Sequence, residues 1–190
     1  FDREGIIARP VRHLDDAYLC QAFVIPGGES TTLMHLLRAS GLGDYFKQQH
    51  QDGAAFWGTC AGAIVCAKQA LQPQTSTLDL IDVTVYRNAY GRQLNSRLVS
   101  LKSAYDAEHS LGTGVMIRAP LFKRWGAGVQ PMVCAAEGEV MALAGDRCLL
   151  TSFHPELSDG APLNWHRWFA HVAFAPSADF TELTMKDHCL

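Results

Sequence analysis

The sequence predicts an α/β protein of three layers, in which a mainly parallel, doubly wound sheet carries an antiparallel extension. Two observations support this fold class. In the N-terminal part, short apolar strands are twice followed by a glycine-containing turn and a helix, an alternation typical of parallel sheets covered on both faces. In the C-terminal part, short strands follow one another with turn residues between them, which is typical of antiparallel pairing.

The strand–turn–helix units lie in the first 70 residues. One strand ends at the glycine turn 26–28 and is followed by a helix from Ser30, with a hydroxyl residue at its N-cap and a stop at Gly41. The unit then recurs, because an apolar strand breaks sharply at 58–60 and runs directly into an apolar helix. The expected strands cover 5–11, 17–25 and 54–57. One expected helix begins at Ser30, and two others cover 44–51 and 61–70.

The rest of the chain is rich in short strands. Turn residues at 137–138 and 145–146 separate the last three of them. One helix follows, and beyond it the weak pattern of residues 175–190 indicates a loosely held tail. The expected strands cover 80–86, 97–101, 114–117, 132–135, 139–144 and 148–153, and the apolar side of the helix consists of Trp165, Trp168, Phe169 and Val172.

Length and composition favour one domain over residues 1–190, since 48% of the residues are hydrophobic and 18% are charged. A net charge of −3 without a Lys/Arg run argues against nucleic acid or an anionic membrane as the main partner. No apolar stretch has the length of a membrane span and no leader opens the chain, so we expect a cytoplasmic protein. The six cysteines form no Cys-x-x-Cys pair and no metal-ligand spacing with the histidines, which favours neither a metal site nor disulfides.

Cys60 is the candidate nucleophile. Small residues on both sides of it, Gly58 and Gly62, suit a strained strand-to-helix turn that leaves the sulfur exposed at the top of a sheet. The sulfur would lie at the positive end of the following helix, which favours the thiolate, and the amide of Ala61 would point toward an oxyanion. The alternative is an inert, buried cysteine in a tight turn.

His154 and Glu156 are the candidate base and its partner. Two residues apart in an extended chain, their side chains lean to the same side, so Glu156 can accept from one ring nitrogen and leave the other facing Cys60. Pro155 between them suits a strand that has just passed the end of its pairing. A His-Pro-Glu sequence by itself is more often a surface turn, but an elbow cysteine upstream favours the catalytic interpretation.

The glycine turn after the first unit's strand is a candidate oxyanion hole. Gly27 and Gly28 let backbone amides approach the sulfur without a Cβ in the way, and together with Ala61 they could bind a tetrahedral intermediate. The alternatives are an ordinary turn that starts a helix, or a phosphate cradle. Glu29 disfavours the cradle because its carboxylate would repel an anion.

Five segments together resemble one family, the glutaminase subunits of pyridoxal 5'-phosphate synthase, which are class I (triad-type) glutamine amidotransferases of flavodoxin-like fold. The GTCAG and HPE motifs are shared more widely among class I amidotransferases, whereas the other segments are narrower. The segments are 26–32 (PGGESTT), 58–62 (GTCAG), 87–93 (RNAYGRQ), 117–120 (IRAP) and 152–157 (SFHPEL).

The resemblance implies that Cys60 attacks the side-chain amide of L-glutamine, that His154 protonates the departing ammonia, and that water then releases glutamate. It implies a hetero-oligomer in which ammonia passes to a separate synthase (lyase) subunit that makes the vitamin B6 cofactor; no cofactor is expected for this chain. An Arg near the substrate is sensible because guanidinium pairs with carboxylate in bidentate fashion, although a surface ion pair is the alternative. The glutamine-binding residues implied are Gly28, Glu29, Ser30, Arg87, Ile117 and Arg118.

The chain departs from the family at its start. Members of the family open with a strand and a helix, including a Leu-Gln-Gly-type segment near the active site, and none of this precedes Phe1. We expect that the natural protein contains residues ahead of Phe1; the alternative is a truncated, non-catalytic regulator. The stretch 94–97 also lacks an expected aromatic–acidic pair. Further alternatives are the glutaminase subunit of another pathway and a cysteine hydrolase on the same sheet.

Overall fold

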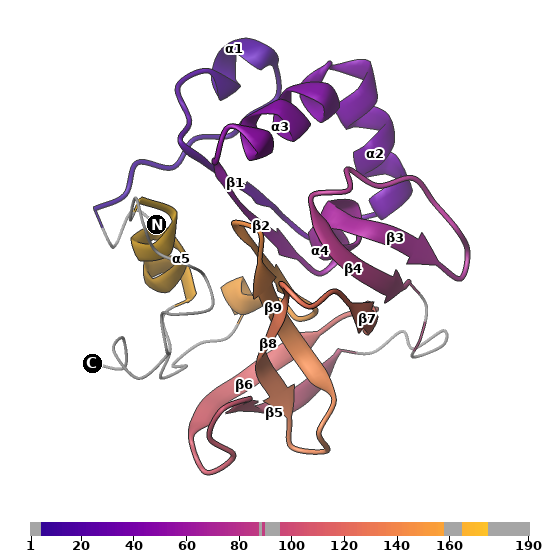
Figure 1. The fold of residues 1–190 in the computed structure, drawn as a ribbon, viewed down its shortest axis with the longest axis vertical. Helices are drawn as coiled ribbons and strands as arrows, with labels where there is room; N and C mark the ends of the chain where they lie inside the picture. Colours follow the sequence, from indigo (N-terminus) through magenta and orange to yellow (C-terminus); the bar gives the residue numbers. More distant parts are fainter. Residues whose placement is uncertain (1–4, 88, 90–95, 158–164, 175–190) are drawn as a thin grey trace.

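The computed structural model describes residues 5–87, 89, 96–157 and 165–174, and Figure 1 shows its ribbon. The predicted tail, 175–190, lies outside these residues. The helices are α1 (Leu14–Ala17), α2 (Ser30–Ala39), α3 (Leu42–Gln51), α4 (Ala61–Cys66) and α5 (Trp165–Phe174), with a 3₁₀ turn, η2, over Pro155–Leu157. The strands are β1 (Ala22–Ile25), β2 (Ala55–Thr59), β3 (Ala67–Leu71), β4 (Ile81–Tyr86), β5 (Arg97–Ser103), β6 (Ser110–Met116), β7 (Leu121–Trp125), β8 (Gln130–Ala135), β9 (Val140–Gly145) and β10 (Cys148–Thr151).

The main sheet has seven strands in the order β1-β2-β10-β9-β8-β5-β6. Its first three strands are parallel, since β2 pairs in parallel with both β1 and β10. The remaining neighbours, from β10 through β9, β8 and β5 to β6, are antiparallel. The parallel core and the antiparallel extension predicted from the sequence are both present, and the extension contributes more strand pairs than the core does.

Helices cover both faces of the parallel core, as Figure 1 shows. Alternate residues of β2 divide between two clusters of buried side chains: Phe56 packs with α2, α3 and α4, whereas Trp57 packs with α5. β10 divides in the same way, with Leu150 on the α4 side and Leu149 on the α5 side. This period of two is what a strand buried on both faces requires, and it produces the three layers. The predicted apolar side of α5 is buried throughout.

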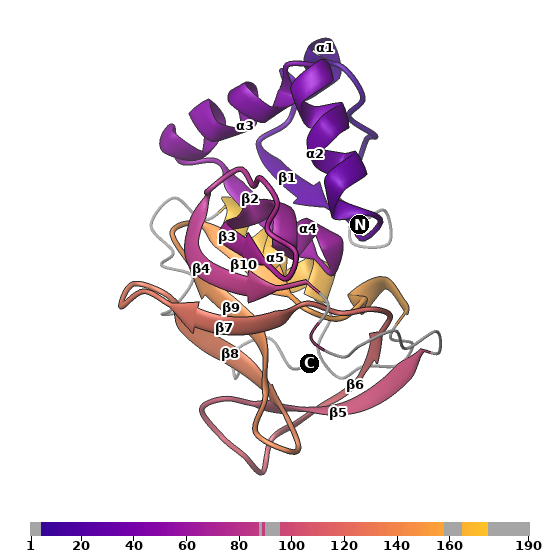
Figure 2. The same cartoon turned by 90° about the vertical axis from the view of Figure 1, so that its right-hand side faces the viewer.

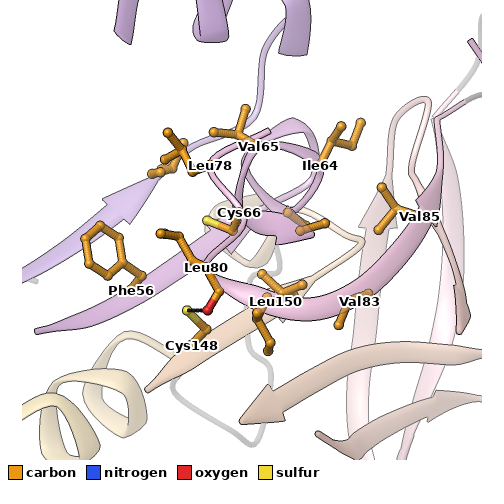
Figure 3. Close-up of a cluster of buried hydrophobic side chains, with 14 of the residues drawn as sticks. Phe56, Ile64, Val65, Cys66, Leu78, Leu80, Val83, Val85, Cys148 and Leu150 are labelled. Carbon is orange, nitrogen blue, oxygen red and sulfur yellow. Dashed lines mark hydrogen bonds between the residues drawn. The ribbon is translucent and has the colours of Figure 1, made fainter. Parts of the chain in front are cut away.

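A second sheet, of order β3-β4-β7, packs beside α4 and is seen in Figure 2. Its presence corrects the expected helix over 61–70, because α4 ends at Cys66 and the chain continues as β3. The carbonyls of Val65 and Cys66 accept hydrogen bonds from the amides of Leu78 and Leu80, so a later segment replaces the next helical turn. Figure 3 shows this junction, where the buried thiol of Cys148 also donates to the Leu80 carbonyl. β7 was not predicted.

The expected strand over 5–11 is wrong. Residues 6–12 form no strand pair within the described part of the chain, and Ile7 is 90% exposed. The expected strand over 17–25 begins only at Ala22, because Ala17 ends α1. Asp16 accounts for the helix: its carboxylate accepts from the backbone amides of Arg12 and His13, which starts a helix at Leu14 that runs into the expected strand at Ala17.

The other expected elements are present with shifted ends. α3 begins two residues before the expected 44–51, and β10 ends at Thr151 before the expected 153. No helix within the described residues has the length and apolar character that a bilayer crossing needs.

Candidate active site

Cys60 lies at a strained elbow between β2 and α4. Its backbone has φ 51° and ψ −110°, a conformation that costs a non-glycine residue about 1–3 kcal/mol. Neighbouring backbones pass so close that a Cβ at Gly62 would lie 1.8 Å from the carbonyl oxygen of Ile25, and one at Gly58 would lie 2.6 Å from the backbone of Gly62. The predicted need for glycine on both sides of the cysteine is therefore confirmed.

The side chain of Cys60 is covered by three other segments, so the expectation of an exposed sulfur is wrong: the residue is 5% exposed. Its Sγ donates to the carbonyl oxygen of Ile117 at 3.5 Å, and it lies close enough to His154 to raise the pKa of the imidazole. A Cβ at Gly27 would lie 3.5 Å from the Cβ of Cys60. The sulfur thus lies in a nearly closed space between the β1–α2 turn, the end of β6 and the segment after β10.

His154 is held by its own backbone and by Glu156. Its amide donates to the carbonyl of Val115 at 2.8 Å, which attaches the segment after β10 to β6. Its Nδ1 lies 2.8 Å from Oε1 of Glu156. The expected pairing of the two side chains is present, but the expected extended geometry is wrong, because Pro155 begins the 3₁₀ turn η2 and this turn carries Glu156.

The charges of His154 and Glu156 stabilise one another. The hydrogen bond with Cys60, followed by that with Glu156, raises the pKa of His154 to about 10, against the lowering effect of burial. Burial is the largest single effect and would raise the pKa of Glu156, but the hydrogen bond from His154, a backbone hydrogen bond and the charges of His154 and His166 together outweigh it, and the pKa is lowered. At neutral pH the ring is therefore an imidazolium between the sulfur and a carboxylate.

The turn between β1 and α2 passes directly over the imidazole. A Cβ at Gly27 would lie 2.6 Å from Cε1 of His154, so only glycine permits this approach. Gly28 has φ 147°, a region that also favours glycine. The oxyanion-hole function of Gly27, Gly28 and Ala61 stays a prediction that their position at the elbow and the turn allows.

Glu29 caps α2, which corrects the expected hydroxyl N-cap. Its carboxylate accepts from the amides of Thr31 at 3.1 Å and Thr32 at 2.7 Å, and these backbone hydrogen bonds lower its pKa to about 2. The same carboxylate forms an ion pair with Nη2 of Arg87 at 3.2 Å. Two of the residues implied to bind glutamine therefore contact each other.

Of the other residues implied to bind glutamine, Ile117 contacts the sulfur through its carbonyl oxygen. Ser30 is the buried first residue of α2, and Arg118 is exposed with φ 50° beside Ile117. Residues 88 and 90–93 of the RNAYGRQ segment lie outside the described residues. Sequence reasoning missed the Val115 carbonyl that holds His154 and the Thr31 hydroxyl beside Arg87; only the inclusion of Thr31 in PGGESTT could have indicated it.

No group of three His, Cys, Asp or Glu side chains suited to a metal ion occurs among the residues that the structure describes. The cysteines described, 20, 60, 66, 134 and 148, are free thiols.

Comparison with known proteins gives one consistent set of relatives. Residues 2–174 match the model of the SNO glutamine amidotransferase family. Pyridoxal 5'-phosphate synthase subunit PdxT of Dehalococcoides mccartyi is 39% identical over 171 residues, covering 89% of this chain and 86% of the relative. The protein of the same name from Thermus thermophilus is 39% identical over 175 residues, covering 90% and 87%.

Among solved structures, a crystal structure of a glutamine amidotransferase superposes with a TM-score of 0.81 at 36% identity, covering 92% of this chain and 90% of that one. This likeness confirms the predicted class of fold.

Proposed function

The chain belongs to the SNO glutamine amidotransferase family, and from this premise we propose that it hydrolyses L-glutamine to L-glutamate and ammonia as the glutaminase subunit of a pyridoxal 5'-phosphate synthase. Relatives that carry the name of this synthase's subunit match about nine-tenths of the chain, which supports the assignment. The single observation that carries the chemistry is the contact of Cys60 with an imidazole that is itself paired with Glu156.

In the first half-reaction, Cys60 attacks as the thiolate, its proton being held by the imidazolium of His154; Sγ forms a bond to the carboxamide carbon of glutamine, and the carbonyl oxygen becomes an oxyanion. The imidazolium of His154 gives its proton to the amide nitrogen, the C–N bond breaks, and ammonia leaves a glutamyl thioester. The amides of Gly27, Gly28 and Ala61 donate hydrogen bonds to the oxyanion, a contribution that is often among the largest in acyl transfer.

In the second half-reaction, the now neutral His154 takes a proton from water while the water oxygen bonds to the thioester carbon. The C–S bond then breaks, which returns the sulfur as a thiolate beside an imidazolium, and the new carboxyl group of glutamate loses its proton to solvent. Glu156 keeps Nδ1 occupied throughout, so the other ring nitrogen serves the sulfur and the water in turn.

Glutamine is held by charged and backbone groups around the sulfur. Glu29 is ionised at neutral pH and more than half exposed, so it can pair with the α-ammonium of the substrate. A guanidinium suits the α-carboxylate. The proposed glutamine-binding residues are Gly28, Glu29, Ser30, Arg87, Ile117 and Arg118.

The partner is a synthase (lyase) subunit, with which the chain forms a hetero-oligomer in the cytoplasm. Ammonia that escapes into water is diluted and protonated, which removes its nucleophilic lone pair. Direct transfer between subunits preserves the nucleophile, and this is the physical reason for coupling the two active sites.

Glutaminase activity measured with the synthase subunit of the same source tests the proposal. We expect Cys60→Ala to abolish glutamine hydrolysis while the variant still binds the synthase, and Cys134→Ala, at a half-buried thiol of β8, to behave as wild type. Hydrolysis that survives Cys60→Ala overturns the assigned nucleophile. Stimulation by the synthase of another pathway instead identifies a different amidotransferase, and an inactive wild type bound to its synthase identifies a regulatory subunit.

A further inference from the structure

We propose that Thr31 is a positioning residue for glutamine binding: its hydroxyl holds the guanidinium of Arg87 against Glu29. This inference rests on the proposed function, because it concerns the same substrate. Thr31 was assigned no function by the sequence pattern or by the resemblance.

Thr31 contacts both members of the ion pair with different atoms. Its backbone amide donates to Oε1 of Glu29 at 3.1 Å, and its Oγ1 accepts from Nη2 of Arg87 at 3.0 Å. The direct contact between the two charged groups, also from Nη2 to Oε1, is longer at 3.2 Å. A single guanidinium nitrogen is therefore shared between a carboxylate and a hydroxyl that are themselves tied together.

The guanidinium has few other fixed partners. Nη1 donates to the Pro73 carbonyl at a long 3.4 Å, and Nε is buried without a hydrogen-bond partner among the described residues. The Arg87 side chain is 13% exposed, so water cannot readily replace a lost contact. Without the Thr31 hydroxyl, one ion pair of moderate length would be left to fix the orientation of a forked, five-donor group.

The contact also joins two parts of the fold. Arg87 follows β4 of the second sheet, and its backbone amide donates to the Leu71 carbonyl at the end of β3. Glu29 and Thr31 begin α2, directly after the glycine turn that lies over His154. A guanidinium fixed at this junction holds the second sheet in a constant position relative to the turn. We therefore expect the contact to affect substrate binding.

Thr32 provides a matched control. Its hydroxyl donates to Oε2 of the same carboxylate at 3.0 Å, and in the described part of the chain Thr32 forms no hydrogen bond with Arg87. Thr31→Val and Thr32→Val each remove one hydroxyl from adjacent exposed positions at the start of the same helix. Their difference therefore reports the contact with the guanidinium rather than a general effect on the helix cap.

The experiment measures KM and kcat for glutamine with each variant in complex with the synthase subunit. We expect Thr31→Val to raise KM about tenfold, as the loss of roughly one charge-assisted hydrogen bond implies, with a smaller change in kcat. Thr31→Ser, which keeps the hydroxyl, restores KM, and Thr32→Val leaves KM within about twofold. In combination with Arg87→Lys, the effect of Thr31→Val on KM becomes smaller than in the wild-type background.

Equal KM values for Thr31→Val and Thr32→Val, failure of Thr31→Ser to restore KM, or full additivity with Arg87→Lys overturns the inference. Thermal unfolding of the same samples separates a loss of folded protein from a specific effect on KM. A variant that merely unfolds loses kcat and melting temperature together. The KM of such a variant is then measured at a temperature where it is folded. A wild-type complex that hydrolyses no glutamine would refute the proposed function instead, so the two failures are distinguishable.

Discussion

Gly27 lies so close to His154 that a methyl group on its Cα would stand 2.6 Å from Cε1 of the imidazole. The contact joins the turn after β1 to the segment after β10, and it leaves the ring no room to move toward the turn. Because the imidazole must reach both the sulfur and the substrate nitrogen, this glycine fixes the geometry of the proposed proton transfer.

Gly27→Ala should therefore damage catalysis more than stability. The added methyl group pushes the imidazole away from the sulfur, and a displacement of about 1 Å costs roughly 100-fold in rate. Steady-state glutaminase assays with the synthase subunit measure kcat, and thermal unfolding measures stability. Gly128→Ala is the control, because a Cβ at Gly128 meets nothing within 4 Å. A Gly27→Ala variant with normal kcat would show that the ring is not held as described.

The local geometry of the site could be predicted because it depends on local sequence. Gly58 and Gly62 flank Cys60 because neighbouring backbones at a strand-to-helix elbow pass too close for a Cβ. The close approach of Gly62 to Ile25 is an instance of this crowding. The pairing of His154 with Glu156 needs only a separation of two residues, and it forms in a 3₁₀ turn as readily as in the extended chain that was expected.

The errors arise where distant segments decide the local structure. α4 stops at Cys66 because residues 78–80 supply the donors to its last carbonyls, which no pattern within 61–70 reveals. The burial of Cys60 depends on Ile117 and His154, which are far along the chain. β7 has three exposed residues at its end and carries a weak apolar pattern, so pairing with β4 rather than composition makes it a strand.

The charge state of His154 should depend on both of its neighbours. A pKa raised above the unfolded value means that the ring's stabilising contribution is fully present below about pH 6.5 and is lost as the pH rises through about 10. Glu156→Gln and Cys60→Ala should each lower this pKa, and Cys60→Ala should lower it more because the hydrogen bond with Cys60 is the larger cause.

Titration of the His154 ring resonances by NMR measures these shifts, with the unfolding free energy between pH 6 and 10 as a second readout. In both variants the loss of stability should still begin near pH 6.5, the unfolded value, but it should be smaller and end at a lower pH than in wild type. An unchanged titration in Cys60→Ala would contradict the contact between the sulfur and the ring.

Glu29 should stabilise α2 in a pH-dependent way. Its lowered pKa means that the contribution is present above about pH 4.5 and is lost as the pH falls toward about 2. Glu29→Ala should cost about 1 kcal/mol at pH 7, the usual value of an N-cap, and less at pH 3. Urea unfolding at the two pH values measures the difference. A cost that is equal at both would mean that the carboxylate is not the cap.

The free thiols should react very unequally with a glutamine-analogue alkylator. Cys66 is fully buried and burial raises its pKa to about 12, and burial also raises the pKa of Cys148 well above its usual range, so both stay protonated and inaccessible. Cys60 adjoins the raised-pKa imidazole of His154 and is the proposed nucleophile for glutamine, so the analogue should modify it first. Peptide mass mapping after brief exposure identifies the labelled residue. Glutamine in excess should protect Cys60, and Cys60→Ala should remove the fast labelling, because burial raises the pKa of the other thiols within the described residues, those of Cys20, Cys66, Cys134 and Cys148. Labelling that spreads evenly over the cysteines, or that glutamine does not slow, would show that the pocket around Cys60 does not recognise the substrate.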